Sequence, residues 1–134
     1  LGMNQTELNN NPQLSSSVVQ NLATNTKLPF HDCFFNICLI TVSVQYLIHP
    51  IAIFNEIARV LIPGSPCIVT FSNRCFPTKA VAIWHQLTNT GHAKLVGQYF
   101  DTTQKFEPYT VRDISPIEGQ GDPLFLVSAR TQPV

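Results

Sequence analysis

The stretch 34–42 is the feature that most limits how this chain can fold. It is rich in aromatic and β-branched residues and does not alternate between apolar and polar positions, so it predicts a strand buried on both faces. A helix is predicted from Pro50, and a second apolar strand at Cys67–Phe71 follows the Pro63–Gly64 break. The apolar positions of the helix recur at helical spacing at Ile53, Phe54, Ile57, Val60 and Leu61. This strand, helix and strand predict a crossover with parallel strands, and therefore an α/β fold.

The segments before the crossover are polar and short. Asn4 is predicted to cap a brief helix, with Glu7 three residues later in the capping-box position. A weak strand is predicted at Val18–Leu22, and a polar turn over residues 23–27 follows it.

The segments after the crossover predict further helix and two strands. Thr78 is expected to cap a helix that Asn89–Gly91 interrupts, and helical spacing resumes after the interruption. The last strands are predicted at Phe106–Ile114 and Leu124–Ala129. A turn containing Gly119 and Gly121 joins them and favours antiparallel pairing.

Composition and charge exclude several classes of function. The 134 residues are 44% hydrophobic, which suits a single domain over residues 1–134. Eight basic and eight acidic residues give no net charge, so nucleic acid and anionic membranes are not expected partners. The apolar runs are too short to cross a bilayer, and no signal peptide precedes them, so a soluble, intracellular protein is expected. The four cysteines have none of the two-residue spacings of zinc sites, and no metal is expected.

Several motifs together resemble the second half of class I S-adenosylmethionine-dependent methyltransferases. The most specific is Phe54-Asn-Glu-Ile-Ala-Arg-Val-Leu-Ile-Pro-Gly, with a strand on each side. The segments beginning at Phe71 (Phe-Ser-Asn-Arg-Cys-Phe-Pro-Thr-Lys-Ala) and at Asp122 (Asp-Pro-Leu) are similar to type 11 methyltransferases. The resemblance implies a partial Rossmann-like sheet, with family strands in the order 4-5-7-6, strand 7 antiparallel, strand 3 uncertain, and helices on both faces.

The same resemblance indicates which parts of the cofactor site are missing. The glycine-rich turn that holds S-adenosylmethionine would lie before Leu1, so the start resembles a cut. Gly2 and Asn21 stand where the family usually has acids that bind the ribose and the adenine. Asn36 and Ser65 also depart from the family, which often has aspartate and glycine there. We therefore expect the isolated chain not to bind S-adenosylmethionine.

The resemblance also supplies candidate site residues, each with a plainer alternative. Asn21, Leu22, Thr41 and Val42 would contact the cofactor, although an asparagine after a strand is an ordinary turn residue. The substrate candidates, which are equally compatible with surface positions, are Gln45, Tyr46, Asn73 and Arg74. No catalytic residue is predicted, because methyl transfer depends mainly on alignment of the reacting groups.

Two further groups of side chains are candidates for a functional role, each with a structural alternative. His85 and His92 have no carboxylate at a fixed offset, so a general-base role is not favoured. Trp84, Tyr99 and Phe100 recur at helical spacing, which is more typical of a core than of a substrate pocket.

Two functions remain open from the sequence. In the first, the chain is part of an enzyme that methylates a small molecule in its intact form. In the second, it is a non-catalytic relative that associates with itself or a partner through exposed strand edges.

Overall fold

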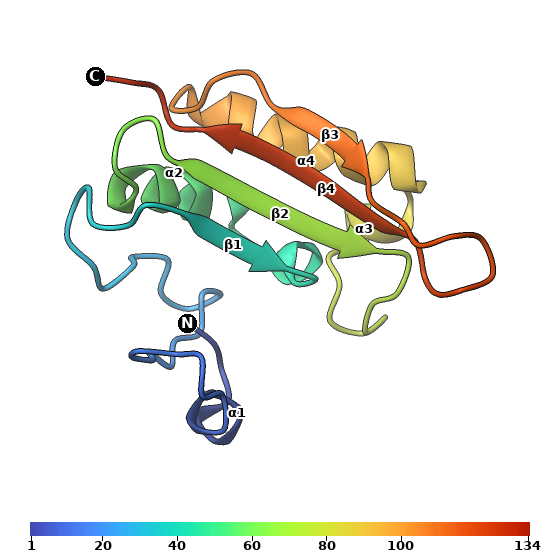
Figure 1. The fold of residues 1–134 in the computed structure, drawn as a ribbon, viewed down its shortest axis with the longest axis horizontal. Coiled ribbons are helices and arrows are strands. Elements are labelled where there is room, and N and C mark those ends of the chain that lie inside the picture. Colours follow the sequence, from blue (N-terminus) through green and yellow to red (C-terminus); the bar gives the residue numbers. More distant parts are fainter.

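The computed structural model describes residues 1–134 and contains a four-stranded mixed sheet in the order β1-β2-β4-β3 (Figure 1). Strand β1 (Cys38–Thr41) pairs in parallel with β2 (Pro66–Ser72). Strand β4 (Leu124–Arg130) is antiparallel both to β2 and to β3 (Thr110–Asp113). This arrangement confirms the predicted α/β fold and the family order 4-5-7-6 with strand 7 antiparallel.

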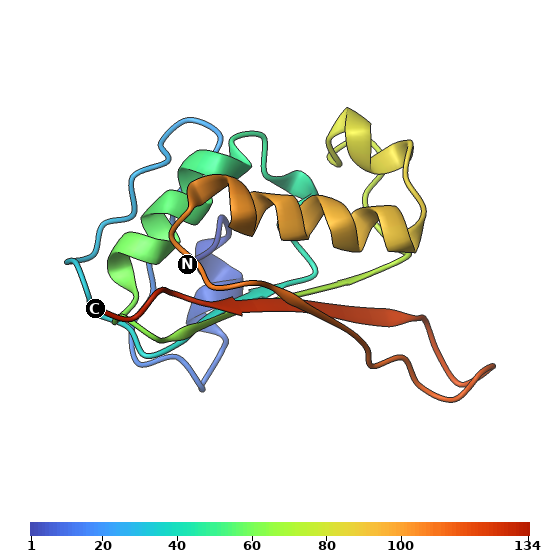
Figure 2. The ribbon, with the colours of Figure 1, turned by 90° about the horizontal axis from the view of Figure 1, so that it is seen from above.

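The resemblance implies helices on both faces of the sheet, but the helices that follow β1 all lie on one face (Figure 2). They are α2 (Pro50–Val60), α3 (Ala82–His85) and α4 (Asn89–Thr103), and a 3-10 turn, η1 (Val44–Tyr46), connects β1 to α2. Pro50 occupies the first turn of α2, where its missing N–H is not needed. Helix α1 (Gln5–Asn9) lies apart in the N-terminal segment, and the Asn4 side chain caps it as predicted. No helix combines the length and the apolar character needed to traverse a bilayer.

The core lies between the sheet and this helical layer. Alternate residues of β2 are buried because one face of the strand packs against α2 and α4. Aromatic rings join the two helices, since Phe54 of α2 meets Tyr99 and Phe100 of α4 at centroid distances of 5.6 and 4.9 Å. Apolar burial on this one face is therefore what holds the layers together.

The stretch 34–42 differs from its prediction, because only Cys38–Thr41 forms a strand and it is not buried on both faces. Leu39 is 63% exposed, and its neighbours along the strand are only half-buried. β1 has a partner strand on one side only, and no helix covers the face opposite α2. The prediction of a strand buried on both faces is therefore wrong: the apolar composition is typical of a central strand, but β1 lies at the edge of the sheet with no neighbouring strand on its outer side.

The predicted helix after Thr78 begins later and is interrupted earlier. Residues 76–80 form a turn in which the N–H groups of Lys79 and Ala80 donate to the Phe76 carbonyl, so Thr78 caps nothing. Helix α3 starts only after Val81. Thr88 caps the longer helix α4 by accepting from the Gly91 N–H, so the segment Asn89–Gly91 opens a helix rather than ending one.

The predicted strand at Val18–Leu22 is reduced to one bridge. Val19 pairs in parallel with Gly2, through hydrogen bonds of 3.1 Å from the Gly2 N–H to the Val18 carbonyl and 3.0 Å from the Gln20 N–H to the Gly2 carbonyl. This single bridge does not extend into a ladder, because the chain turns away on both sides of it.

Gly97 allows the closest approach in the helical layer. A Cβ atom on this residue would lie 2.2 Å from the Tyr109 ring, so the ring packs directly on the backbone of α4. The loop that carries Tyr109 leads into β3, and the contact therefore attaches the sheet edge to the helix.

We expect Gly97→Ala to destabilise the protein by about 1–3 kcal/mol, because the new methyl group overlaps the Tyr109 ring. In a Tyr109→Ala background the same change should become stabilising, since alanine is the better helix former by about 1 kcal/mol. Chemical denaturation of the four proteins measures this double-mutant cycle. Equal effects of Gly97→Ala in both backgrounds would contradict the packing role of Tyr109.

Candidate cofactor and substrate site

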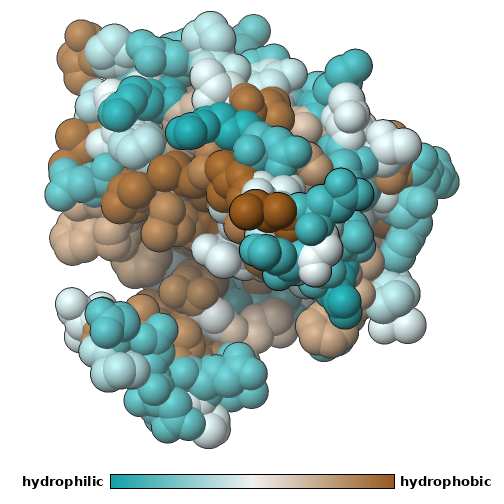
Figure 3. All heavy atoms as spheres, turned by 45° about the vertical axis from the view of Figure 1, so that its right-hand side comes forward, coloured by the Kyte–Doolittle hydropathy of each residue, from teal (hydrophilic) through white to brown (hydrophobic).

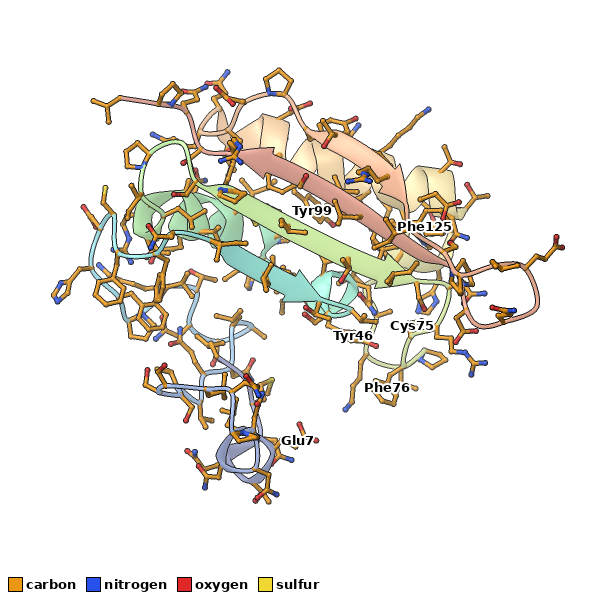
Figure 4. All side chains as sticks on the ribbon, in the orientation of Figure 1. Glu7, Tyr46, Cys75, Phe76, Tyr99 and Phe125 are labelled. Atoms are coloured by element: carbon orange, nitrogen blue, oxygen red, sulfur yellow. The ribbon has the colours of Figure 1, made fainter.

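The carboxyl ends of β1 and β2 lie at the same edge of the sheet because the two strands are parallel. The loops that follow them meet there, as Figure 4 shows for Tyr46 and Phe76. The Tyr46 hydroxyl accepts a hydrogen bond of 2.9 Å from the Phe76 N–H, and the two rings are 6.2 Å apart. This edge is where open α/β sheets bind their ligands.

Val42 turns the chain out of β1 in a conformation that is unusual for its side chain. Its φ is 49°, in the left-handed region that β-branched residues rarely adopt. The Val42 N–H donates to the Thr70 carbonyl at 2.9 Å, so the ladder with β2 extends up to the turn. Such strain costs on the order of 1–3 kcal/mol and concentrates at functional sites. The predicted cofactor residue Val42 therefore stands at a strained corner.

Gln45 is buried beneath this corner rather than exposed to a ligand. It is 1% exposed, its side-chain nitrogen donates to the Val42 carbonyl at 3.3 Å, and its Oε1 has no hydrogen-bond partner. The Gln45 backbone carbonyl accepts from the Val81 N–H, which holds the chain just before α3. In this structure Gln45 connects the turn at Val42 to the segment before α3, and its side chain is not accessible to a ligand.

Asn73 and Arg74 lie on the loop after β2 and are exposed. The Arg74 Nε is 2.6 Å from the Asp122 carboxylate, which lies in the loop before β4. The Arg74 side chain is 79% exposed, and ion pairs this open to solvent contribute about 0–1 kcal/mol. The guanidinium can thus exchange this partner for another anion at little cost.

An apolar groove of about 510 Å³ runs along the outer edge of β1. Fourteen of its sixteen lining residues are hydrophobic, and none is Asp, Glu, His, Lys or Arg. Leu1 and Leu22 line it from the N-terminal segment, and Thr41 and Ser43 line it at the carboxyl end of β1. Figure 3 shows apolar side chains around this hollow. The structure thus brings Leu22 and Thr41, two of the predicted cofactor residues, to one groove.

Asn21, by contrast, serves its own turn. Its Oδ1 accepts from the Ala23 N–H at 2.9 Å, and its carbonyl accepts from the Thr24 and Asn25 N–H groups. An aspartate would accept the same bonds, so the turn does not require an amide. Gly2 is equally unconstrained, because a Cβ there would meet Leu8 at 3.4 Å, an ordinary contact. The fold therefore requires neither glycine at position 2 nor asparagine at position 21.

A charged clamp, formed by Glu56 and Arg59 of α2, holds the segment 28–32 that borders the groove. Glu56 accepts from the Leu28 N–H at 2.8 Å, and Arg59 donates to the Leu28 and Phe30 carbonyls at 2.9 and 2.8 Å. Arg59 also pairs with Glu56 at 2.7 Å and with Asp32 at 2.8 Å. This clamp was not predicted from the sequence. The spacing of Glu56 and Arg59, three residues apart in α2, could have indicated an ion pair.

The clamp shifts the ionisation of both partners. The hydrogen bonds from Arg59 lower the pKa of Glu56, with a smaller contribution from the Leu28 N–H, and burial opposes them. The same bonds raise the pKa of Arg59. Both groups therefore remain charged at neutral pH, as the clamp requires.

The two histidines take structural places. His92 is buried and stacks on Trp84 at 3.7 Å, and its Nε2 lies 2.6 Å from the Trp84 carbonyl. That contact assigns the ring proton to Nε2 and leaves the buried Nδ1 without a partner. His85 is exposed, and its Nε2 lies 2.9 Å from the Pro77 carbonyl. Trp84, Tyr99 and Phe100 lie in the core, as their spacing predicted. No three His, Cys, Asp or Glu side chains converge on a point that would suit a metal ion.

Comparison with known proteins agrees with this geometry. A family described as a methyltransferase domain matches residues 3–69, half of the chain. No curated protein matches the sequence.

Solved structures share the fold at low sequence identity. One is a SAM-dependent methyltransferase of Thermotoga maritima, a possible histamine N-methyltransferase, with a TM-score of 0.56 and 15% identity over 80% of this chain and 61% of that chain. Another is the putative methyltransferase of Haloferax volcanii in complex with the activator Trm112, with a TM-score of 0.58 and 15% identity over 86% of this chain and 61% of that chain. A third, the [4+2]-cyclase SpnF, has a TM-score of 0.56 and 16% identity over 81% of this chain and 55% of that chain.

These matches and the sheet order define the class. The chain belongs to the methyltransferase-domain family and has the fold of class I S-adenosylmethionine-dependent methyltransferases. It spans less than two thirds of the length of each of the three solved structures. Because one of them is a cyclase, the fold alone does not determine the reaction.

The clamp predicts how stability changes with pH. Since the folded-state pKa of Glu56 is lowered, its contribution is present above the unfolded value of about 4.3 and is lost as pH falls through the folded value. Glu56→Gln should cost about 1 kcal/mol of unfolding free energy at pH 7, and the difference from the native chain should shrink below about pH 4. Urea denaturation across this pH range measures the effect.

Glu107→Gln is the matched control, because Glu107 is exposed and its carboxylate makes no hydrogen bond or ion pair. It should leave the unfolding free energy unchanged at both ends of the pH range. An equal loss in the two variants would contradict the clamp.

Proposed function

We propose that this chain is the carboxyl-terminal part of an S-adenosylmethionine-dependent methyltransferase that methylates a small molecule in its intact form. The observation that carries the proposal is the meeting of the loops after β1 and β2 at the ligand-binding edge of a methyltransferase fold. On this proposal Asn21, Leu22, Thr41 and Val42 border the cofactor. The loops that carry Gln45, Tyr46, Asn73 and Arg74 border the methyl acceptor.

The residues present do not by themselves fit the whole cofactor. S-adenosylmethionine has an apolar adenine, but it also carries a ribose diol, a carboxylate, an ammonium group and a sulfonium. The groove offers Leu22 to the adenine and no charged side chain to the other groups. None of the six glycines stands in a turn between a strand and a helix that could present backbone amides to the carboxylate. We therefore propose that these 134 residues do not bind the cofactor alone.

Titration calorimetry tests this with the chain as it is. We expect no measurable binding of S-adenosylmethionine, because the groups that neutralise its charged end are absent. The double variant Gly2→Asp with Asn21→Asp should also fail to bind, since both substitutions are sterically tolerated but neither supplies the turn. Micromolar affinity of the unmodified chain would contradict the proposal.

The mass of the protein in its native source tests the other half of the proposal. A mass well above the 14.9 kDa of this chain, together with binding of S-adenosylmethionine by that native protein, is the expected result. A native protein of 14.9 kDa that does not bind the cofactor would overturn it.

The open edge of β1 supports a second candidate function, association with a second copy of the chain. Val42 continues the ladder to β2, so by alternation Leu39 and Thr41 direct their backbone groups toward the unpaired side. Leu39 and Ile37 are 63% and 47% exposed beside the apolar groove, and the chain carries no net charge to keep copies apart.

Sedimentation analysis separates this function from the first. The chain should dimerise at micromolar concentration, and Leu39→Lys should give a monomer by placing a charge at the pairing edge. Val111→Lys is the matched control, because Val111 is 47% exposed on β3 at the opposite edge of the sheet. A monomeric native chain, or equal dissociation of both variants, would contradict pairing through β1.

A further inference from the structure

Two of the four cysteines face each other across the parallel pair of strands. Cys38 of β1 is in register with Cys67 of β2, so their side chains project to the same face of the sheet. Neighbouring strands lie about 4.7–4.9 Å apart. This spacing is inside the Cα separation of about 4.4–6.8 Å that a disulfide bond spans. Both thiols are free in this structure.

The two thiols differ in their access to solvent. Cys67 is fully buried between β2 and the helical layer, with an exposed fraction of 0%. Cys38 is half-buried and lines the groove along the β1 edge, together with Ile53 and Ile57 of α2. Cys38 therefore borders the groove, whereas Cys67 is not among the residues that line it.

The thiols also differ in acidity. Hydrogen bonding with the neighbouring Cys67 thiol lowers the pKa of Cys38, while burial opposes the shift. The pKa of Cys67 is raised by that same hydrogen bond and by burial. Cys38 is therefore the thiol of the pair that ionises more readily.

We propose that Cys38 and Cys67 form a two-thiol site that undergoes exchange with small, uncharged disulfides entering the groove. The Cys38 thiolate attacks one sulfur of the disulfide, so a protein mixed disulfide forms and one thiolate leaves. Cys67 then loses its proton to water, attacks the sulfur of Cys38 and releases the second thiolate. The products are one Cys38–Cys67 disulfide and two molecules of reduced thiol, so the small disulfide is the oxidant.

The position of the pair separates this site from the proposed cofactor edge. Cys38 and Cys67 lie at the amino ends of β1 and β2, whereas the loops with Tyr46 and Phe76 lie at the carboxyl ends. Disulfide formation would join the edge strand covalently to its neighbour without blocking that edge. The inference does not depend on the proposed function.

The test uses the full chain with Cys33→Ser and Cys75→Ser, which removes the two thiols outside the pair. Dipyridyl disulfide is the probe, and released thiopyridone and intact mass are the readouts. We expect release of two equivalents of thiopyridone and a protein that has lost two hydrogens. Adding Cys67→Ala should stop the reaction at one equivalent with a stable mixed disulfide on Cys38. Adding Cys38→Ser instead should prevent reaction in the native state, although unfolding should expose Cys67 to the probe.

The pH dependence of the first step distinguishes activation from mere accessibility. Cys67→Ala removes the hydrogen bond, so the reaction of Cys38 at pH 7 should slow about threefold to tenfold and its pH profile should move to higher pH. Circular dichroism checks that each variant is folded, and alanine suits the buried site because it leaves no unpaired polar group. The proposal is overturned if the background chain stops at one equivalent. It is also overturned if Cys67 reacts in the folded Cys38→Ser chain, or if Cys67→Ala leaves the profile of Cys38 unchanged.

Discussion

The parallel pairing of β1 with β2 is the constraint from which the other features of this protein follow. It places the carboxyl ends of both strands at one edge, where Tyr46 meets the Phe76 backbone. It also aligns Cys38 with Cys67 at the opposite end. A single crossover through α2 thus creates a ligand-binding edge and, separately, a pair of facing thiols. The pairing itself is held by the burial of alternate β2 side chains against α2 and α4.

β1 pairs with β2 along one edge, but no strand pairs with its other edge. The Glu56–Arg59 clamp holds the segment 28–32 against α2, and the Gly2–Val19 bridge gives the N-terminal segment a little sheet character of its own. Between these parts and β1 lies an apolar groove without charged side chains. This groove borders both the open edge of β1 and the side chain of Cys38.

Much of the fold could be predicted from the sequence, and the predictions that were wrong share a physical cause. The crossover, the antiparallel final pair and the core aromatic residues follow from local periodicity, which reports the faces that a segment must bury. The run at 34–42 and the strand at Val18–Leu22 were overestimated, because apolar composition indicates a need for neighbours but not whether the chain supplies them. Thr78 and Thr88 are equally good caps by type. Only the turn at Phe76–Ala80 and the bond from Val81 to Gln45 decide between them.

The sequence by itself determined the class of fold and the identity of the residues at positions 2 and 21, Gly2 and Asn21. Only the tertiary structure decided what surrounds them. It shows that neither Gly2 nor Asn21 is required by the backbone, that Gln45 is buried, and that Cys38 and Cys67 lie opposite each other. The reason is physical: periodicity encodes which face of an element is apolar, whereas proximity between distant residues depends on strand register and on which segments fill each edge.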